Sequence, residues 1–303
     1  MSTSQLVWLI TGTSTGLGRD LALAALERGE KDIATARARS LHLLADLKEK
    51  GAETLELDVT APLDDLKKVA DKAVGIYGRV DVLVNNAGYI LVGALEESTY
   101  SFAIFTRSFF VDEHYFRPEE TFDQFNTNVF GALNVTRAFL PHMRARRTGT
   151  FVWLGSIGAW RAVPNAGLYG TTKWALRGIS ETLQVEVSPL GLRSICIDFG
   201  YFRTSFLKGD HRKPYVAKID DYKEIMVKVE SALQAYNGKQ PGDPKKGVQV
   251  MLDVVRGEGV AQGKEFPNSL LLGSDCFEGV QDQIQGYLKL QKEWTGVSKS
   301  TDF

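Results

Sequence analysis

The sequence predicts an α/β fold, a single domain built on a doubly wound parallel sheet of seven strands. Short apolar runs bounded by turn residues alternate with longer helical patterns through most of the 303 residues. That alternation is typical of a parallel sheet with helices on both faces. A glycine-rich turn stands directly after the first apolar run, and polar residues follow several later runs. Because the carboxyl ends of parallel strands share one edge of the sheet, these residues are expected to meet there.

Seven segments are expected to be strands, and most are continuous apolar runs of the kind that a parallel sheet buries on both faces. The second strand is unusual because Asp32 stands in it. The expected strands are residues 6–10, 32–36, 54–59, 80–84, 151–156, 192–198 and 270–272.

Amphipathic patterns between these runs predict the helices. The expected helices are the segment from the glycine turn to Leu26, residues 41–50, 62–77, 118–146, the helix that carries Tyr169, and residues 220–236, 245–256 and 278–294. Residues 94–97 are expected to start a further helix. Residues 201–243 are expected to form a substrate lid with one helix, and residues 295–303 a polar, mobile tail.

The composition excludes several classes of protein. A net charge of −1 implies no polyanion partner, so no nucleic acid. The two cysteines are far apart and not in metal-ligand spacing, which favours a reduced, cytoplasmic setting without a metal site. The first apolar run is too short for a signal-peptide core, and no run approaches the ~18 residues of a membrane span. The expected partner is a small-molecule substrate, and a homo-oligomer remains open.

The glycine-rich turn predicts a loop that holds a dinucleotide. Glycines permit a tight turn and close approach of a pyrophosphate, and the following helix N-terminus donates N–H groups to the anion. Glycines also simply end strands, but this turn follows the first strand and opens a helix, as a phosphate-binding loop requires. The expected contact residues are Gly12, Ser14, Thr15, Gly16, Leu17 and Gly18.

The end of the second strand bears on the choice of cofactor. In dinucleotide-binding folds an acid near this point takes the ribose 2′-hydroxyl, whereas an arginine suits a 2′-phosphate. The strand ends at Ala36 without an acid, and Arg37 and Arg39 follow it. Arg37 is expected to bind the phosphate, so NADP(H) is favoured over NAD(H). The alternative is that both arginines are solvated loop charges.

Other strand ends complete the expected cofactor site. Asp58 either caps the next turn or accepts a hydrogen bond from an adenine amino group, and both interpretations stay open. The segment after the fourth strand combines small residues, which let backbone approach a ligand, with an amide that ties loop backbone together. The further cofactor residues are Val59, Asn85, Ala87, Gly88, Gly200 and Thr204.

The stretch from residue 151 to 177 predicts the chemistry. Tyr169 and Lys173 are four residues apart, so they share one face of a helix. A nearby ammonium lowers the pKa of a phenol, and a tyrosine so tuned acts as general acid or base. Ser156 ends the preceding strand and is placed to hydrogen-bond a substrate oxygen. Such pairs are common on helix surfaces, and the upstream serine and glycine turn favour the functional interpretation.

In combination these motifs resemble the short-chain dehydrogenase/reductase family over nearly the whole chain. The resemblance rests on Thr11-Gly12-x-x-x-Gly16-x-Gly18, Asn85-Asn86-Ala87-Gly88, Asn128, Ser156 and Tyr169-x-x-x-Lys173. It implies a Rossmann-like fold, a nicotinamide cofactor, and hydride transfer between a carbonyl and an alcohol. It also implies that Tyr169 transfers the proton and that Lys173 lowers its pKa and, like Tyr169, contacts the cofactor. Ser156 then orients the substrate oxygen, and Asn128 holds a water in a proton relay.

The segment Gly200–Thr204 looks like the 17β-hydroxysteroid-dehydrogenase-like group of that family, which does not establish a steroid substrate. Two positions depart from the family pattern. Phe199 stands where proline is common, so the geometry of the loop at the nicotinamide is in doubt, and Asp32 stands where an apolar residue is usual.

Residues 100–117 are a third departure. Five Phe and two Tyr stand there without a clear period, and deleting the segment restores an ordinary helix start. A retained intron and a true insertion are both open. Two structural interpretations of the segment are open as well. It is either a tolerated surface loop or a hairpin that contacts a membrane or a partner. We expect it to project outward and to place no residue in the active site.

The leading hypothesis is an NADP(H)-dependent oxidoreductase, a carbonyl reductase or dehydrogenase acting on a secondary alcohol. A catalytically weak NADP-binding regulatory protein on the same fold is the alternative. An oligomeric interaction protein on this fold is a third, for which the sequence has no dedicated feature.

Overall fold

The computed structural model describes residues 5–97, 120–207, 215 and 219–303. These residues form one seven-stranded sheet in the order β3-β2-β1-β4-β5-β6-β7, with every neighbouring pair parallel. The predicted doubly wound, Rossmann-like α/β fold is therefore confirmed. The strands are β1 Val7–Ile10, β2 Lys31–Ala36, β3 Glu53–Glu56, β4 Val82–Asn85, β5 Gly149–Ser156, β6 Leu192–Phe199 and β7 Ser269–Leu272.

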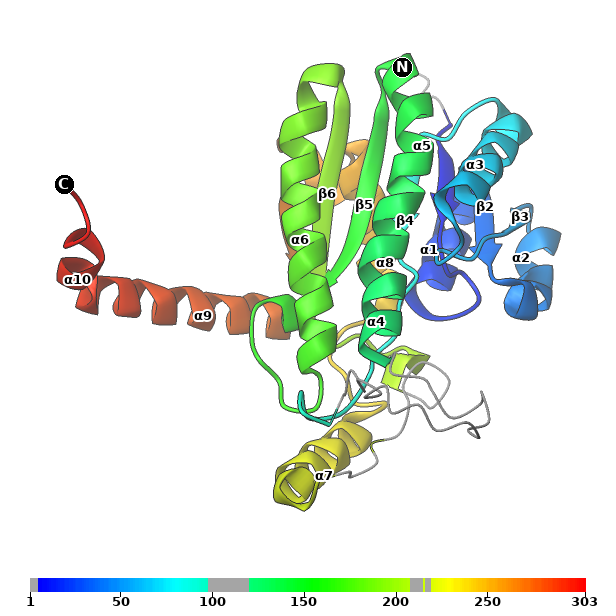
Figure 1. Cartoon of the computed structure of the whole chain (residues 1–303). Helices are drawn as coiled ribbons and strands as arrows, with labels where there is room; N and C mark the ends of the chain where they lie inside the picture. Colours follow the sequence, from blue (N-terminus) through cyan, green and yellow to red (C-terminus); the bar gives the residue numbers. More distant parts are fainter. Residues whose placement is uncertain (1–4, 98–119, 208–214, 216–218) are drawn as a thin grey trace, which may run out of the picture.

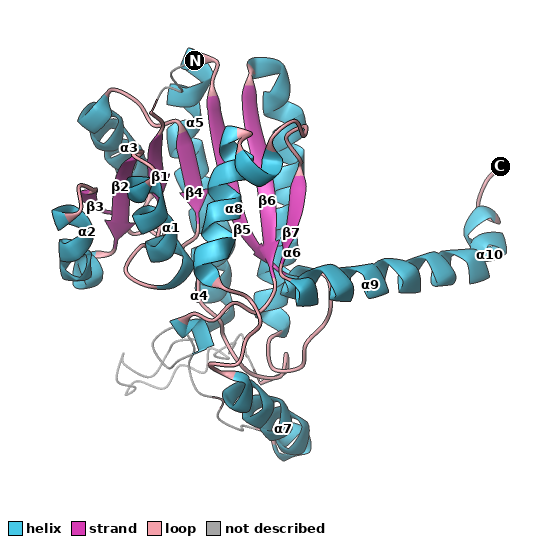
Figure 2. Ribbon diagram, turned by 180° about the vertical axis from the view of Figure 1, so that it is seen from behind, coloured by secondary structure: helices cyan, strands magenta, loops and turns pink. Residues whose placement is uncertain are grey.

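Helices cover both faces of this sheet (Figures 1 and 2). The α-helices are α1 Gly16–Glu27, α2 Ala45–Glu49, α3 Leu63–Tyr77, α4 Glu120–Phe125, α5 Ala132–Arg146, α6 Gly167–Val187, α7 Asp220–Tyr236, α8 Pro244–Arg256, α9 Ser274–Glu293 and α10 Thr295–Lys299. Short 3₁₀ turns occupy Ala38–Leu44, Ile157–Ala159, Ser188–Leu190, Ser205–Leu207 and Gly259–Ala261.

The alternation of side chains along the strands divides the core into two layers. Trp8, Ala34 and Val152 face α1 and α8, while Leu9 and Phe151 face α3, α5 and α6. Because successive strand residues point to opposite faces, a continuous apolar run supplies both layers. This explains why the buried strands read as unbroken hydrophobic runs.

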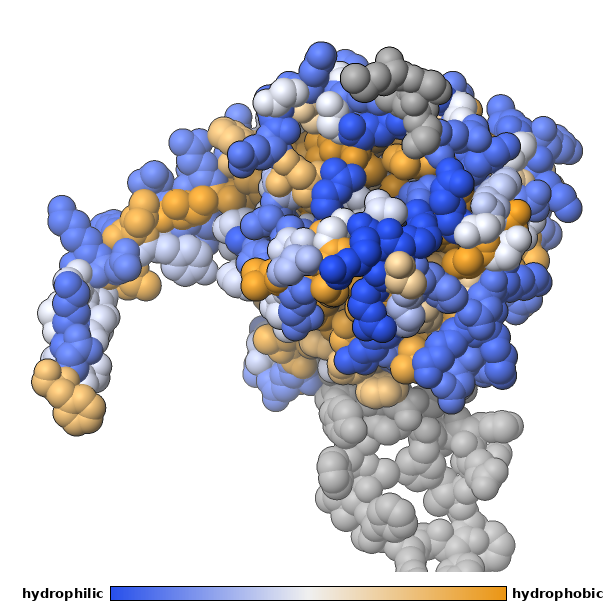
Figure 3. Space-filling model, turned by 90° about the horizontal axis from the view of Figure 1, so that it is seen from above, coloured by the Kyte–Doolittle hydropathy of each residue, from blue (hydrophilic) through white to orange (hydrophobic). Residues whose placement is uncertain are grey.

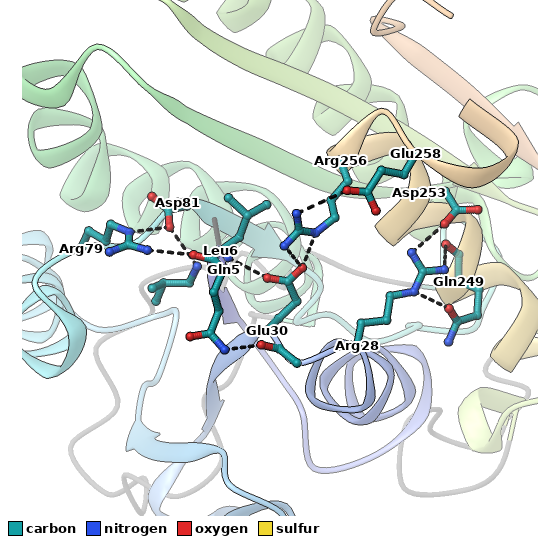
Figure 4. A network of polar contacts seen from close by, with 12 residues as sticks. Gln5, Leu6, Arg28, Glu30, Arg79, Asp81, Gln249, Asp253, Arg256 and Glu258 are labelled. Carbon is teal, nitrogen blue, oxygen red and sulfur yellow. Dashed lines mark hydrogen bonds and ion pairs between the residues drawn. The ribbon is translucent and has the colours of Figure 1, made fainter. Parts of the chain in front are cut away.

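An ion-pair network closes the amino-terminal edge of the sheet (Figure 4). The carboxylate of Glu30, whose side chain is 1% exposed, binds Arg256 and accepts a hydrogen bond from the Leu6 backbone N–H. Asp81 similarly binds Arg79 and Arg146. Buried charges are tolerated when they are paired and hydrogen-bonded in this way. The opposite, carboxyl-terminal edge is left for the site.

Several element boundaries differ from the sequence prediction. Residues 95–97 form a turn, although a helix start was expected there. The expected helix over residues 41–50 is a 3₁₀ turn followed by the short α2, and the third strand ends at Glu56. The long helix before β5 contains a π-helical turn, Asn126–Gly131. The tail carries the short helix α10, although its side chains are exposed as expected.

The predicted lid and tail both extend from the sheet. Helix α7 of the lid lies beyond the carboxyl edge, at the bottom of Figure 1, and α9 projects sideways with α10 at its end. Residues 100–117 lie outside the described part of the chain. Among the described residues, no helix combines the length and apolar character that crossing a bilayer requires.

Candidate active site

A cavity of about 1530 Å³ lies at the carboxyl edge of the sheet. Segments that follow β1 to β6 line it, so the strand ends converge as the topology requires. The lining contains Gly12, Ser14, Thr15, Gly16, Leu17, Arg37, Asp58, Val59, Ala87, Gly88, Ser156, Tyr169, Lys173, Gly200 and Thr204. Of the residues that the sequence singled out, Gly18, Asn85 and Asn128 do not line it.

The glycine turn has the geometry that a bound pyrophosphate needs. Gly16 begins α1 with φ +63°, and a Cβ there would meet no atom within 4 Å, so the position is open but strained for any other residue. Gly18 acts differently, since its Cβ would lie 2.3 Å from the Asn86 side-chain nitrogen. Gly18 therefore lets the loops pack, and the open N-terminus of α1 fits an anion.

The loop after β4 is held by Asn86 rather than by Asn85. The Asn86 amide donates to the carbonyl oxygens of Thr11 and Gly12, at 2.7 and 2.9 Å. Asn85 was expected to bind cofactor, but it is buried, and its amide donates to the Thr136 hydroxyl at 2.8 Å. Adjacent residues at a strand end point to opposite faces of the sheet, so the two asparagines differ in their contacts. Binding of the cofactor by Asn85 stays a prediction.

Asp58 makes the capping contact that was one of the two roles left open for it, and a contact with adenine stays a prediction. Its carboxylate accepts from the backbone N–H and the hydroxyl of Thr60, at 2.9 and 2.7 Å. It caps the turn after β3 and remains in the cavity wall beside Val59. Arg37 also lines the cavity, directly after the end of β2, together with Arg39 and Ser40.

A buried carboxylate fixes the loop that carries Ser156. Asp198 on β6 is 0% exposed and accepts from the Ser156 backbone N–H at 2.9 Å and from the Trp160 indole N–H at 2.8 Å. Burial raises the pKa of Asp198, and these two hydrogen bonds act in the opposite direction. A Cβ on Gly155 would lie 1.9 Å from the same carboxylate, so only glycine fits before Ser156. Asp198 therefore fixes where the serine hydroxyl lies.

Tyr169 and Lys173 extend from α6 into the same wall. The Lys173 nitrogen lies 5.6 Å from the centre of the Tyr169 ring and donates to the Leu154 carbonyl at 2.6 Å. Burial lowers the pKa of Lys173 to about 8. Burial also raises the pKa of Tyr169, and its hydrogen bond with Ser156 offsets part of that rise. The expected lowering of the Tyr169 pKa by Lys173 is therefore not the net result in this structure.

Asn128 lies in the π-helical turn and joins two elements of the site. Its side chain accepts from the Tyr89 N–H at 3.1 Å and donates to the Tyr89 carbonyl at 3.0 Å and the Thr172 hydroxyl at 3.2 Å. It thereby ties the loop after β4 to α6, next to Tyr169 and Lys173. In this structure it holds the framework of the site and does not reach the cavity.

The lid is attached through a turn that the sequence did not single out. Glu97 is 2% exposed, and its carboxylate accepts from the Tyr215 hydroxyl and the Ile219 N–H, both at 3.0 Å. The same carboxylate accepts from the Ala94 N–H at 3.1 Å. Leu233 of α7 and Phe206 after β6 line the cavity, so Glu97 fixes the predicted lid segment beside the cavity.

A family model described as short chain dehydrogenase matches residues 6–214. That match covers the sheet through β6, the glycine turn and the wall formed by Ser156, Tyr169 and Lys173. The chain belongs to the short-chain dehydrogenase/reductase family. Members of this family are NAD(P)-dependent oxidoreductases, and the fold and cavity described above are of that type.

Relatives in this family match most of the chain. Oxidoreductase BOA17 of Botryotinia fuckeliana is 30% identical over 297 residues, 96% of this chain and 97% of its own. A 3-ketodihydrosphingosine reductase of Bacteroides thetaiotaomicron is 31% identical over 73% of this chain and 72% of its own. A short-chain dehydrogenase from Streptomyces avermitilis has a solved structure with 35% identity, full coverage of both chains and a TM-score of 0.82.

More distant solved structures share the fold alone. ElxO with NADP bound has a TM-score of 0.65 at 22% identity, covering 91% of this chain and all of its own. A Burkholderia phymatum short-chain dehydrogenase/reductase in complex with NAD has a TM-score of 0.71 at 18% identity, covering 98% and 96%. Because both cofactors occur on this fold, the preference of this chain has to come from its own residues.

Sequence reasoning missed three residues that shape the site. Asn86 is the neighbour of Asn85, and their roles differ only because their side chains point to opposite faces at the end of the strand. Asp198 ends an apolar strand, and a carboxylate in that position was a usable signal of a buried partner. Glu97 lies in an expected helix start, where an acid is ordinary.

Proposed function

We propose that this chain transfers hydride between NADP(H) and a carbonyl or secondary alcohol substrate, with Tyr169 as proton donor or acceptor. The observation that carries the proposal is the meeting of Ser156, Tyr169 and Lys173 in one wall of a cavity that the glycine turn also lines. The wall offers a hydroxyl, a phenol and an amine within one site, and those groups serve proton transfer to a substrate oxygen.

In the reducing direction, Tyr169 gives its proton to the carbonyl oxygen as that oxygen gains negative charge. The Ser156 hydroxyl donates a hydrogen bond to the same oxygen and holds it near the phenol. A nicotinamide cofactor, when bound, would supply the hydride in this direction and accept it in the other. Since burial raises the pKa of Tyr169, the free site holds the phenol protonated, which is the form that reduction uses. In the oxidising direction, Tyr169 acts as the phenolate and takes the proton from the alcohol.

Lys173 has two roles in the proposal. Its ammonium stabilises the Tyr169 phenolate after proton transfer, and it would hold the ribose of a bound nicotinamide cofactor. Burial lowers the pKa of Lys173 to about 8, so the ammonium is progressively lost as pH rises through that value, and its stabilisation of the phenolate is lost with it. Asn128 acts through the loop that it holds, and a relay water bound at its side chain is a further part of the proposal.

The preference for NADP(H) rests on the segment after β2. Arg37 lines the cavity, and Ala36 leaves no acid to repel a 2′-phosphate. A charge-assisted hydrogen bond to phosphate contributes roughly 1.5–3 kcal/mol, or about one to two decades of affinity. Arg37→Ala should therefore weaken NADPH by ten- to a hundredfold and leave NADH almost unchanged, as measured by fluorescence titration. An equal loss for both cofactors would assign Arg37 to the fold instead, and Arg144→Ala on α5, outside the cavity lining, is the matched control.

The substrate side of the cavity favours an apolar carbonyl compound. Trp160, Val163, Tyr201, Phe206 and Leu233 line it, and such walls bind apolar surface. Two substrate classes are the first to test. Ketosteroids are suggested by the likeness of Gly200–Thr204 to the 17β-hydroxysteroid-dehydrogenase-like group. Long-chain 3-keto amino alcohols are suggested by the similarity to the 3-ketodihydrosphingosine reductase of Bacteroides thetaiotaomicron.

A carbonyl panel tests the function. Oxidation of NADPH at 340 nm should accelerate with at least one apolar ketone and should be slower with NADH at equal concentration. Ser156→Ala should abolish most of that rate. An intact chain that binds NADPH but reduces no member of a broad panel would favour the alternative, a weak NADP-binding protein.

A reduced, cytoplasmic setting remains part of the proposal, since Cys196 and Cys276 are both free and buried.

A further inference from the structure

The projecting C-terminal segment, α9 with α10, exposes an apolar stripe. Phe277, Ile284, Tyr287, Leu288 and Trp294 expose 59, 43, 53, 52 and 55% of their surface. Their spacing places them along one side of the helix, over a length of about 26 Å. Figure 3 shows apolar side chains running along the segment as it leaves the body. Every residue from 284 to 303 is exposed.

Such a helix needs a partner to be stable. Most helical stability in proteins comes from packing of an amphipathic face, and an isolated helix of this length is marginal in water. Gly286 and Gly296 lower the intrinsic helix propensity further, at about 1 kcal/mol each. The first turns of α9 are fixed to the body, where Cys276 and Val280 are 0 and 1% exposed. The distal part therefore requires a surface that the described residues of a single chain do not supply.

The charges on the segment indicate what that surface is. The proximal half carries the acids Asp275, Glu278 and Asp282, whereas the distal half carries lysines 289, 292 and 299 and a single acid, Glu293, which pairs with Lys289. Two copies laid antiparallel bring the acidic half of each against the basic half of the other. Glu278 and Lys292 are about four helical turns apart, so they flank the stripe on the same side. They are also equally distant from residue 285.

We propose that α9 and α10 pair antiparallel with the same segment of a second copy of this chain, about a two-fold axis near Gln285. This is an isologous contact, in which the same patch serves both copies. Glu278 of each copy faces Lys292 of the other, and the two apolar stripes cover one another. The antiparallel arrangement also opposes the two helix dipoles favourably.

This pairing lies next to the candidate active site. Gln283 and Tyr287 line the cavity, and a Cβ on Gly279 would lie 3.0 Å from Ile157, the residue after Ser156. The antiparallel geometry places the distal end of one copy along the base of the other, beside these residues. The contact therefore fixes the base of α9 against the loop that carries Ser156.

Sedimentation velocity of the full chain tests the pairing. The wild-type chain should dimerise, and Ile284→Glu and Leu288→Glu should each raise the dimer dissociation constant at least about tenfold, because each buries a charge twice in one interface. Val260→Glu, at an apolar residue 56% exposed outside the segment, should leave it unchanged. A monomeric wild-type chain, or a dimer that withstands both arm substitutions, would overturn the proposal.

Charge exchange and cross-linking test the direction. Glu278→Lys should weaken the dimer about two- to tenfold, and adding Lys292→Glu should restore it. Gln285→Cys should give a covalent dimer with a short bismaleimide, while Ser298→Cys should not, because the two distal ends lie far apart. Cys196 and Cys276 are buried and serve as the background. Three results would each contradict the antiparallel dimer. Cross-linking could occur preferentially at residue 298, or the second charge change could fail to restore the dimer. The segment could also bind phosphatidylcholine vesicles in place of a second copy.

Discussion

At the residue scale, the candidate site depends on a carboxylate that does not touch the cavity. Asp198 accepts from the Ser156 backbone and from Trp160. The Ser156 N–H lies at the end of β5 and Trp160 lies in the segment between β5 and α6, so the carboxylate sets the position of the serine relative to Tyr169. A charge held at 0% exposure is justified only by such contacts.

Asp198→Asn is expected to lower kcat by on the order of ten- to a hundredfold, since a small misplacement of a catalytic group costs about that much. The amide keeps the shape of the side chain but presents one acceptor oxygen to two donors. The affinity for NADPH, measured by titration, should stay within a factor of about two. Asp253→Asn is the matched control, because Asp253 also accepts from a backbone N–H, that of Val260, at the opposite edge. Normal kcat in a folded Asp198→Asn protein would show that Ser156 is held by other contacts.

Much of this residue-level chemistry could be predicted because spacing determines it. A tyrosine and a lysine four residues apart on a helix share a face whatever the details, and a serine at a strand end points to the ligand edge. The state of the phenol could not be predicted, because burial raises the pKa of Tyr169 and the hydrogen bond with Ser156 offsets only part of that rise. Asn85 and Asn86 also could not be separated, since the register of the strand end decides which one faces the loop.

At the element scale, strands and long helices follow from their patterns, whereas their ends depend on tertiary contacts. Helix α7 occupies the predicted residues 220–236, because its pattern is long and periodic. The helix start expected at residues 94–97 is a turn because the Glu97 side chain binds the Ala94 N–H and the lid. No local pattern indicates that long-range contact.

Glu97→Ala is expected to loosen the lid and to raise KM for the substrate several-fold, with little effect on NADPH binding. The substitution removes the acceptor for Tyr215 and Ile219, which fix the lid beside the cavity. Steady-state kinetics over a substrate series measure the effect, and Glu49→Ala on the exposed side of α2 is the control. A rise in the dissociation constant of NADPH without a change in KM would place Glu97 on the cofactor side.

At the scale of the whole molecule, the chain separates stability from function. The amino-terminal edge of the sheet is closed by paired charges (Figure 4), and the carboxyl-terminal edge holds the cavity. The buried carboxyl group of Asp32 has no such partner. Asp32 is 0% exposed, both its carboxylate oxygens lack a hydrogen-bond partner, and the Trp8 indole N–H beside it in the sheet register is also unpaired.

Burial raises the pKa of Asp32 to about 8, so the folded state holds this proton more tightly than the unfolded state. Stability is therefore unaffected by Asp32 below pH ~4 and is lost progressively as pH rises from there to about 8. Asp32→Asn should raise Tm more at pH 8.5 than at pH 5.5. The difference between the two shifts should correspond to several kcal/mol at most in the free energy of unfolding. Differential scanning fluorimetry across this range measures it. An equal shift at both pH values would mean that Asp32 is ionised in the folded chain throughout.

The central claim is that the Tyr169 hydroxyl transfers the proton in a cavity that also binds NADPH. Tyr169→Phe keeps the ring and removes that hydroxyl, and Tyr77→Phe on α3 is the matched control. We expect Tyr169→Phe to lower kcat by ~10²–10⁴-fold on any ketone that the wild type reduces, with the dissociation constant of NADPH nearly unchanged. A folded Tyr169→Phe protein that binds NADPH and turns over at a near-normal rate would contradict the account.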